Sequence, residues 1–116
     1  MFCEEHGIAL LVVFGSVLDE DVADPHDLDV ALLVDSDVDL VAVVSALTGM
    51  LRFDDVDVMD LRRAGVVARD QALSRGLPLY EREAGLFARD QLAAMTQRME
   101  TAWLRELDME LLAEGR

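Results

Sequence analysis

Lysine is absent from this chain of 116 residues, and its ten basic residues are all arginines. No arginine precedes Arg52, so the first 51 residues carry 11 acidic side chains and no formal positive charge. The whole chain has 24 acidic residues and a formal net charge of −14. Acidic surface of this kind repels phosphate and nucleic acid unless metal ions intervene. The composition therefore argues against direct binding of nucleic acid.

Cysteine, histidine and long apolar runs are also scarce. Cys3 is the only cysteine, which excludes an internal disulfide, and with His6 and His26 it lacks the spacing of a zinc site. No apolar run approaches the ~20 residues that span a bilayer, and the opening residues lack the basic start of a signal peptide. A length of 116 residues leaves room for one domain, and a hydrophobic content of 53% is ample for a single core. The scarcity of cysteine and of long apolar runs predicts a cytoplasmic protein without membrane contact.

Two predicted strands carry the most informative pattern in the chain. The apolar run Ile8–Phe14 ends abruptly at Gly15, which is typical of a buried strand that enters a tight turn. A second strand is predicted over residues 28–34. Alternation along that strand places Asp27 and Asp29 on the same face at its start.

These two strands bring together groups that suit a phosphate and a cation. A turn at Gly15 and Ser16 offers backbone N–H groups and a hydroxyl to a phosphate. Carboxylates about 7 Å apart on one strand face, as predicted for Asp27 and Asp29, suit a hard divalent cation. Either half alone is weak evidence, because a chain with 15 aspartates contains Asp-x-Asp by chance. The ordered combination predicts a site for a metal–nucleotide complex.

The middle of the chain alternates between helical and strand patterns. The predicted elements are a helix that begins after residues 35–39, a strand over 55–61, a helix over 62–75 ended by Gly76, and an edge strand over 77–80. Apolar residues at helical spacing in the first of these helices are Val41, Val44, Leu47 and Leu51.

The strand over 55–61 supplies a third carboxylate. Its alternation places Asp55 and Asp57 on one face and Asp60 on the other. If this strand lies beside the one over 28–34, Asp57 approaches Asp27 and Asp29. Three carboxylates can hold two divalent ions, and Asp57 could alternatively accept a proton as a general base.

The last third of the chain, residues 81–114, is predicted to form one long amphipathic helix or two helices joined near Gly85. Its apolar stripe is Leu92, Met95, Met99, Ala102, Trp103, Leu107 and Leu111. Such a stripe can pack on the sheet, at least in its first turns, or form a protein interface. We therefore divide the chain into a core over residues 1–83 and a helical segment over 84–116 that packs on the core, contacts a partner, or does both.

The stretch FGSVLDEDVADPHDLDVALLV resembles the Gly-Ser, ten-residue spacer, Asp-x-Asp signature of the DNA polymerase β-like nucleotidyltransferase superfamily. The chain length and the run VDVMDLRRAGVVARDQALSRGLPLYERE resemble the minimal nucleotidyltransferase (MNT) domains of that superfamily, and the resemblance covers roughly residues 3–83. It implies an α/β (α+β) nucleotidyltransferase fold, a small mixed β-sheet flanked by helices, with a long C-terminal helix.

The resemblance also implies a function. MNT proteins of this kind are antitoxins of helical HEPN-type RNase toxins, and some transfer AMP from ATP to a tyrosine hydroxyl of the toxin with Mg²⁺. By this resemblance Gly15 and Ser16 contact the nucleotide phosphates. Asp27 and Asp29 bind magnesium, and Asp57 completes the metal site or serves as base. The expected assembly is a cytoplasmic hetero-oligomer with the toxin, and a homodimer is the other assembly considered.

The chain departs from this family at two places beside the signature. Many relatives follow Gly-Ser with a small residue, an arginine and a glycine, whereas this chain has Val-Leu-Asp-Glu over residues 17–20. The residue before the first aspartate is often serine and here is His26. The missing arginine removes a triphosphate contact, and Arg52, Arg62 and Arg63 are the candidates to replace it.

Two other functions are compatible with the sequence. The chain could be a binding-only antitoxin or adaptor that masks a basic partner through its acidic face. It also resembles small-molecule nucleotidyltransferases such as aminoglycoside-modifying enzymes, although these need a further domain or a dimer to hold the acceptor. The intact carboxylate pattern favours an active enzyme over a binding-only protein.

Overall fold

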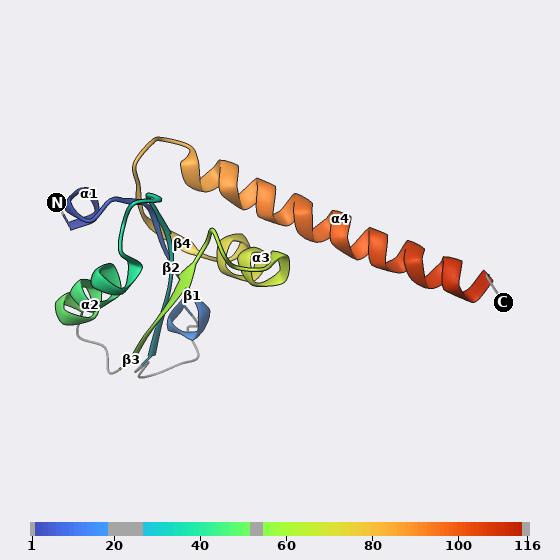
Figure 1. Ribbon diagram of the computed structural model, residues 1–116, viewed down its shortest axis with the longest axis horizontal. Coiled ribbons are helices and arrows are strands. Elements are labelled where there is room, and N and C mark those ends of the chain that lie inside the picture. The colour runs from blue at the N-terminus through green and yellow to red at the C-terminus, as the bar shows by residue number, and fades with distance from the viewer. Residues whose placement is uncertain (1, 19–26, 52–54, 115–116) are drawn as a thin grey trace.

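The computed structural model describes residues 2–18, 27–51 and 55–114. In chain order its elements are α1 (Phe2–Glu5), β1 (Ile8–Phe14), the 3₁₀ turn η1 (Gly15–Leu18), β2 (Asp27–Val34), α2 (Leu40–Met50), β3 (Asp55–Asp60), α3 (Val66–Ser74), β4 (Leu77–Glu81) and α4 (Leu86–Glu114). The four strands form one mixed sheet in the order β3-β2-β1-β4 (Figure 1). β2 and β3 are parallel, and β1 is antiparallel to both β2 and β4. The mixed sheet flanked by helices confirms the predicted fold class.

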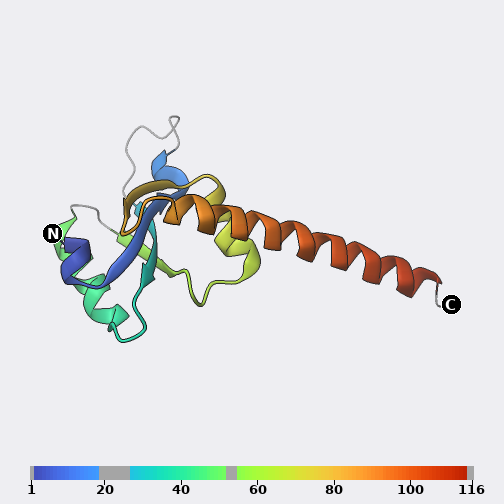
Figure 2. The ribbon, with the colours of Figure 1, turned by 90° about the horizontal axis from the view of Figure 1, so that it is seen from above.

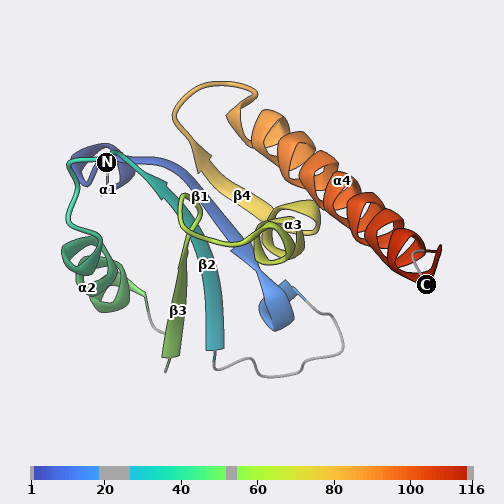
Figure 3. The same ribbon diagram turned by 45° about the vertical axis from the view of Figure 1, so that its right-hand side comes forward.

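Helices cover both faces of the sheet, so the core has two halves (Figure 3). On one face, α1 and α2 pack on the sheet, and Cys3 of α1 joins this half of the core. On the other face, α3 lies against the sheet and α4 lies against α3. Burial raises the pKa of the Cys3 thiol, which agrees with a packing role for this residue.

The predicted alternation of β3 is confirmed by the side chains that join each half of the core. Val56 and Val58 pack on the α2 side. Met59 packs on the α3 side. Asp57 therefore projects on the α3 side, because residues two apart on a strand share a face.

α2 is capped by an aspartate at its N-terminus. It packs on the core through fewer residues than its apolar spacing suggests. Asp39 caps the helix by accepting a hydrogen bond from the Val41 N–H at 3.1 Å. Val43 and Leu47 are its buried side chains. Val41 is 72% exposed, so the first position of the predicted apolar set does not face the core.

The helix predicted over residues 62–75 begins later than expected. Asp60 accepts a hydrogen bond from the Arg62 N–H through Oδ1 at 3.0 Å and another from the Ala64 N–H through its backbone carbonyl at 3.0 Å. These bonds form a local turn directly after β3. α3 therefore begins at Val66, with Gly65 as its N-cap.

The C-terminal segment is one helix of 29 residues, about 43 Å long. It begins directly after Gly85, which has a φ of +88° in the turn that precedes the helix. Glu81 caps the start, because its carboxylate accepts hydrogen bonds from the N–H groups of Gly85 at 3.2 Å and Phe87 at 2.9 Å. Figures 1 and 2 show the helix extending well past the sheet.

α4 packs mainly on α3 rather than on the sheet, and only its first turns reach the core. Leu86 and Ala94 are its buried side chains. Gln91 also ties the two helices together, because its side-chain amide donates hydrogen bonds to the carbonyls of Leu73 at 2.9 Å and Ser74 at 3.3 Å. No helix in the described part of the chain is both long and apolar enough to cross a membrane.

Candidate functional site

The residues of the Gly-Ser and Asp-x-Asp signature lie at one edge of the sheet because of the directions of the strands. β1 ends at this edge, and the parallel strands β2 and β3 begin there. In the register of the sheet, Asp29 lies opposite Phe14 of β1 on one side and opposite Asp57 of β3 on the other. Two strands that are separated in the sequence by α2 thus present carboxylates at matching positions.

Asp29 and Asp57 project on the same face of the sheet, because residues in register on adjacent strands share a face and the strands lie about 4.8 Å apart. Asp57 is exposed and Asp29 is half-buried. The expectation that β3 lies beside β2 is therefore confirmed. Asp27 starts β2 opposite Asp55, and the side chain of Asp27 lies outside the described residues.

Gly15 is in direct contact with Asp29. Gly15 has a φ of +83°, and a Cβ atom at this position would collide with Oδ2 of Asp29 and lie 3.2 Å from its Cγ. Only glycine therefore satisfies both the backbone conformation and the space at the start of η1. The backbone of Ser16 belongs to η1, and its side chain lies outside the described residues.

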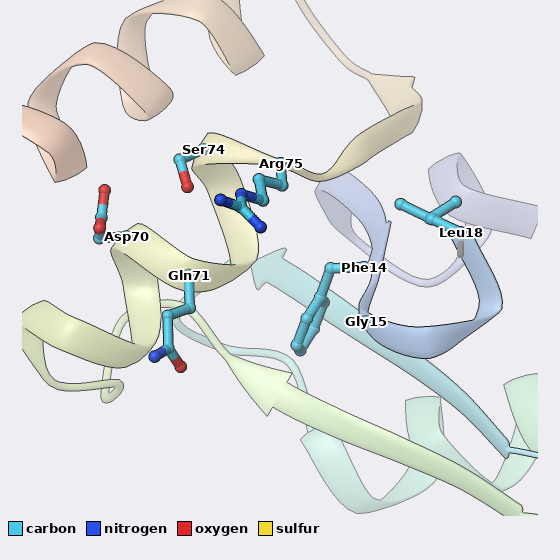
Figure 4. Close-up of a pocket in the computed structure, with 7 residues that line it drawn as sticks. All are labelled: Phe14, Gly15, Leu18, Asp70, Gln71, Ser74 and Arg75. Carbon is cyan, nitrogen blue, oxygen red and sulfur yellow. The ribbon is translucent and has the colours of Figure 1, made fainter. Parts of the chain in front are cut away.

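A cavity of about 1000 Å³ opens beside this contact, between η1 and the last two turns of α3 (Figure 4). The residues that line it are Phe14, Gly15, Leu18, Asp70, Gln71, Ser74 and Arg75. Gly15 belongs to both the cavity and the Asp29 contact, so the two features are adjacent. Arg75 was missed by sequence reasoning, because it is 60 positions from Gly15 and no motif links them.

Two of the three arginines proposed from the sequence as replacements, Arg62 and Arg63, lie elsewhere. β3 runs parallel to β2, so Arg62 and Arg63, which follow β3, lie at the opposite edge of the sheet from Asp29. At that edge the pKa of Asp35, the residue that follows β2, is lowered chiefly by the hydrogen bond from Arg82, with a smaller contribution from the charge of Arg62. Arg62 and Arg63 are thus too far from the signature to contact the same phosphates. Arg52 lies outside the described residues, as do Asp19, Glu20 and His26.

The carboxylates fit a hard divalent cation in ligand type and in register. Mg²⁺ prefers oxygen ligands and usually takes one or two carboxylates together with substrate phosphates. Asp29 and Asp57 provide such a pair beside Gly15. In the part of the chain that the structure describes, which excludes the Asp27 side chain, no three potential ligands are gathered into a metal cluster.

Asp60, the competing carboxylate on β3, has a different role. It lies two register positions beyond Val58, which packs on the α2 side of the sheet, so it points away from Asp29. Its Oδ1 accepts the Arg62 N–H, and its Oδ2 lies 3.7 Å from Nε of Arg63. Asp60 therefore stabilises the turn after β3, as expected from its place on the opposite face.

Comparison with solved structures identifies the same fold in toxin–antitoxin complexes. A structure of a toxin–antitoxin with AMP-PNP is 20% identical and superposes with a TM-score of 0.73 over 97% of this chain and 93% of that chain. A complex of tri-AMPylated Shewanella oneidensis HEPN toxin with MNT antitoxin is 20% identical, with a TM-score of 0.69 over 97% of this chain and 90% of that chain. The toxin–antitoxin MntA–HepT is also 20% identical, with a TM-score of 0.68 over 97% and 91%.

Comparison with curated protein sequences gives no match. A family model described as polymerase beta, nucleotidyltransferase matches residues 1–84, which run from α1 through β4 and include every carboxylate of the candidate site. The match covers well over half of the chain, and the protein belongs to the polymerase beta nucleotidyltransferase family.

Proposed function

We propose that this protein is a Mg²⁺-dependent nucleotidyltransferase that transfers AMP from ATP to a hydroxyl of a HEPN-type toxin, and so acts as its antitoxin. The observation that carries the proposal is the pairing of Asp29 with Asp57 beside Gly15, on the face that holds the cavity. The proposed toxin partner and the transferred AMP draw support from the similar structures, which contain a HEPN toxin and an AMPylated toxin.

Each residue of the signature has a part in the proposed reaction. The backbone N–H groups of Gly15 and Ser16 hold the phosphates of ATP. Asp27, Asp29 and Asp57 are the residues that would hold Mg²⁺, which neutralises charge on the phosphates and favours departure of pyrophosphate. These groups act by positioning and electrostatic stabilisation, because phosphoryl transfer needs little covalent chemistry from the protein.

The transfer exchanges one P–O bond for another. The acceptor hydroxyl oxygen bonds to the α-phosphorus of ATP as the bond from that phosphorus to the bridging oxygen breaks, and pyrophosphate leaves. The hydroxyl proton passes to a base, for which the Asp57 carboxylate is the candidate. Asp57 is exposed, so a hydroxyl carried by another protein can reach it from solvent.

The outward face of α4 is the proposed contact surface for the partner. Leu92, Met99 and Trp103 are 67%, 71% and 62% exposed, and they share one side of the helix because their spacing is seven and four residues. Ala94, which is buried against the core, lies two positions from Leu92 and therefore on the opposite side. Methionine and tryptophan exposed in this way are typical of protein interfaces.

Charge indicates which kind of partner suits this face. Two copies of a chain with a net charge of −14 repel each other, whereas a basic protein is attracted. The proposed assembly is therefore a hetero-oligomer with a basic surface on the toxin. Trp103→Ala should weaken the complex without lowering the melting temperature of the isolated protein, because the indole is mostly exposed.

Transfer of AMP can be tested directly by intact-mass spectrometry. The wild-type protein, incubated with ATP, Mg²⁺ and its candidate helical partner, should increase the mass of the partner by whole AMP units. Asp29→Asn should abolish the increase and leave the complex assembled, because the change keeps side-chain shape and removes a ligand charge. Asp60→Asn is the matched control on the opposite face and should transfer AMP normally.

Binding without catalysis is the second candidate function. It is favoured by the acidic first half of the chain and by the exposed apolar face of α4, both of which could hold a basic partner with no nucleotide. This function requires that the wild-type protein and Asp29→Asn neutralise the partner equally and that neither changes its mass. That result would exclude the proposed transfer reaction.

A further inference from the structure

Arg75 is the one arginine, among the residues that the structure describes, that lines the cavity beside Gly15. We propose that Arg75 binds the polyphosphate of the nucleoside triphosphate and so distinguishes triphosphates from monophosphates. The proposal rests on the proposed function, because it assigns one more residue to the same nucleotide site.

Packing between α3 and β1 determines where Arg75 lies. α3 ends at Ser74, and Arg75 is its C-cap. At the next position a Cβ on Gly76 would collide with the Val12 side chain and with the carbonyl oxygen of Ala72. Glycine at position 76 thus lets the end of α3 approach β1 closely. Because β1 leads directly into Gly15, this approach brings Arg75 to the same edge of the sheet as the signature.

The Arg75 side chain is available for a ligand. It is exposed, and it forms no hydrogen bond or ion pair with any residue of the described ranges 2–18, 27–51 and 55–114. Figure 4 shows its guanidinium group on the cavity side of α3, between Ser74 and Phe14. Asp70, the acidic residue of the cavity, lies on the other side of Ser74 from Arg75 (Figure 4).

The other described arginines are placed where they cannot serve this cavity. Arg82 forms a two-pronged ion pair with Asp35, at 3.0 and 2.9 Å, at the opposite edge of the sheet. Arg62 and Arg63 follow β3 at that same edge. The remaining four are Arg69 of α3, which does not line the cavity, and Arg89, Arg98 and Arg105 of α4.

A helix C-terminus beside a phosphate would by itself be unfavourable, since its carbonyls carry partial negative charge. Here Gln91 donates its side-chain amide to the carbonyls of Leu73 and Ser74, so these two groups are already satisfied. Arg75 then supplies the positive charge that the acidic first 51 residues lack. Its planar guanidinium suits bidentate contact with phosphate oxygens.

Calorimetric titration with Mg²⁺ and a non-hydrolysable ATP analogue tests the assignment. Arg75→Ala should bind the analogue at least roughly tenfold more weakly than the wild type, as expected for a lost charged hydrogen bond. Its affinity for AMP should be unchanged. Arg75→Lys should bind the analogue more tightly than Arg75→Ala but more weakly than the wild type, because lysine keeps the positive charge and lacks the planar guanidinium that makes bidentate contacts. Arg63→Ala removes the same charge at the opposite edge and should bind as the wild type.

Each outcome bears on the proposal. Equal affinity of wild type and Arg75→Ala for the analogue overturns the assignment of Arg75 and leaves the nucleotide site standing. Equal loss of affinity for AMP and for the analogue overturns the polyphosphate role. Failure of the wild type to bind the analogue overturns both the assignment and the proposed function. The melting temperature of Arg75→Ala without ligand should match that of the wild type, and a lower value would indicate a structural role instead.

Discussion

Asp29 lies so close to Gly15 that no side chain fits at position 15. The backbone of Gly15 also has a positive φ of +83°, which L-residues with a Cβ adopt only at a cost. The turn at Gly15 and the Asp29 carboxylate therefore fix each other's position, and a substitution at either residue should displace the other.

Gly15→Ala should destabilise the fold and abolish binding of the Mg²⁺–ATP complex, because it adds a collision with Asp29 to backbone strain of about 1 kcal/mol. Gly85→Ala is the matched control. Gly85 has a φ of +88°, and no atom lies within 4 Å of the added Cβ, so this variant experiences the strain alone. Thermal melts should show the larger loss for Gly15→Ala. Equal losses would contradict the contact with Asp29.

Mg²⁺ and ATP together should raise the melting temperature, because a ligand that binds only the folded state stabilises it. Asp57→Asn should remove this increase, whereas Asp60→Asn, three positions along the chain and on the opposite face, should retain it. ATP in excess EDTA should stabilise little, since phosphates and carboxylates then repel. An increase of the same size in EDTA would exclude the metal-dependent site.

Leu86→Ala and Leu92→Ala make the same change on two sides of α4. Leu86 is 7% exposed and packs in the core, so its truncation should cost about 2–5 kcal/mol. Leu92 is 67% exposed, and its truncation should change stability by no more than about 0.5 kcal/mol. Denaturant unfolding of the isolated protein measures both. A large loss for Leu92→Ala would mean that the apolar face of α4 is covered in the isolated protein.

The Asp35–Arg82 pair should make stability depend on pH. The hydrogen bond from Arg82 holds the pKa of Asp35 below its usual value of 3.8. A carboxyl with a lowered folded-state pKa stabilises the fold above its unfolded pKa, and this stabilisation is lost as pH falls through the folded value.

Asp35→Asn should therefore melt at a slightly lower temperature than the wild type at neutral pH, and the difference should shrink below about pH 3.8. The effect should be small because the pair is exposed, and high salt should reduce it further. Asp37→Asn serves as the control for the change in net charge. A difference that stays constant from neutral to acid pH would show that the ion pair does not contribute.

Local pattern was sufficient for the strands and for the faces of Asp29 and Asp57. An apolar run such as Ile8–Phe14 is buried wherever it lies, and a period of two allows one choice of face for Asp29 and for Asp57. The acidic run over residues 35–39 also predicted the start of α2, because carboxylates favour a helix N-terminus. The roles of Asp27, Asp29 and Asp57 in catalysis stay predictions.

Spacing was less informative where packing decides which residues are buried. Val41 has the spacing of a core residue in α2 but is exposed, because the sheet covers only the side that carries Val43 and Leu47. The apolar stripe of α4 has good helical spacing and faces away from α3. A period defines a face of a helix, and only the neighbouring elements decide whether that face is covered.

The amino-acid sequence by itself determined the family, the order of the strands along the chain and the signature residues Gly15 and Asp29, since each depends on neighbours in the chain. Only the tertiary structure decided that Arg75 lines the same cavity as Gly15 and that Arg62 does not. Position along the chain carries no information about which edge of a sheet a residue reaches. That edge depends on strand direction and on the close approach of α3 to β1 at Gly76.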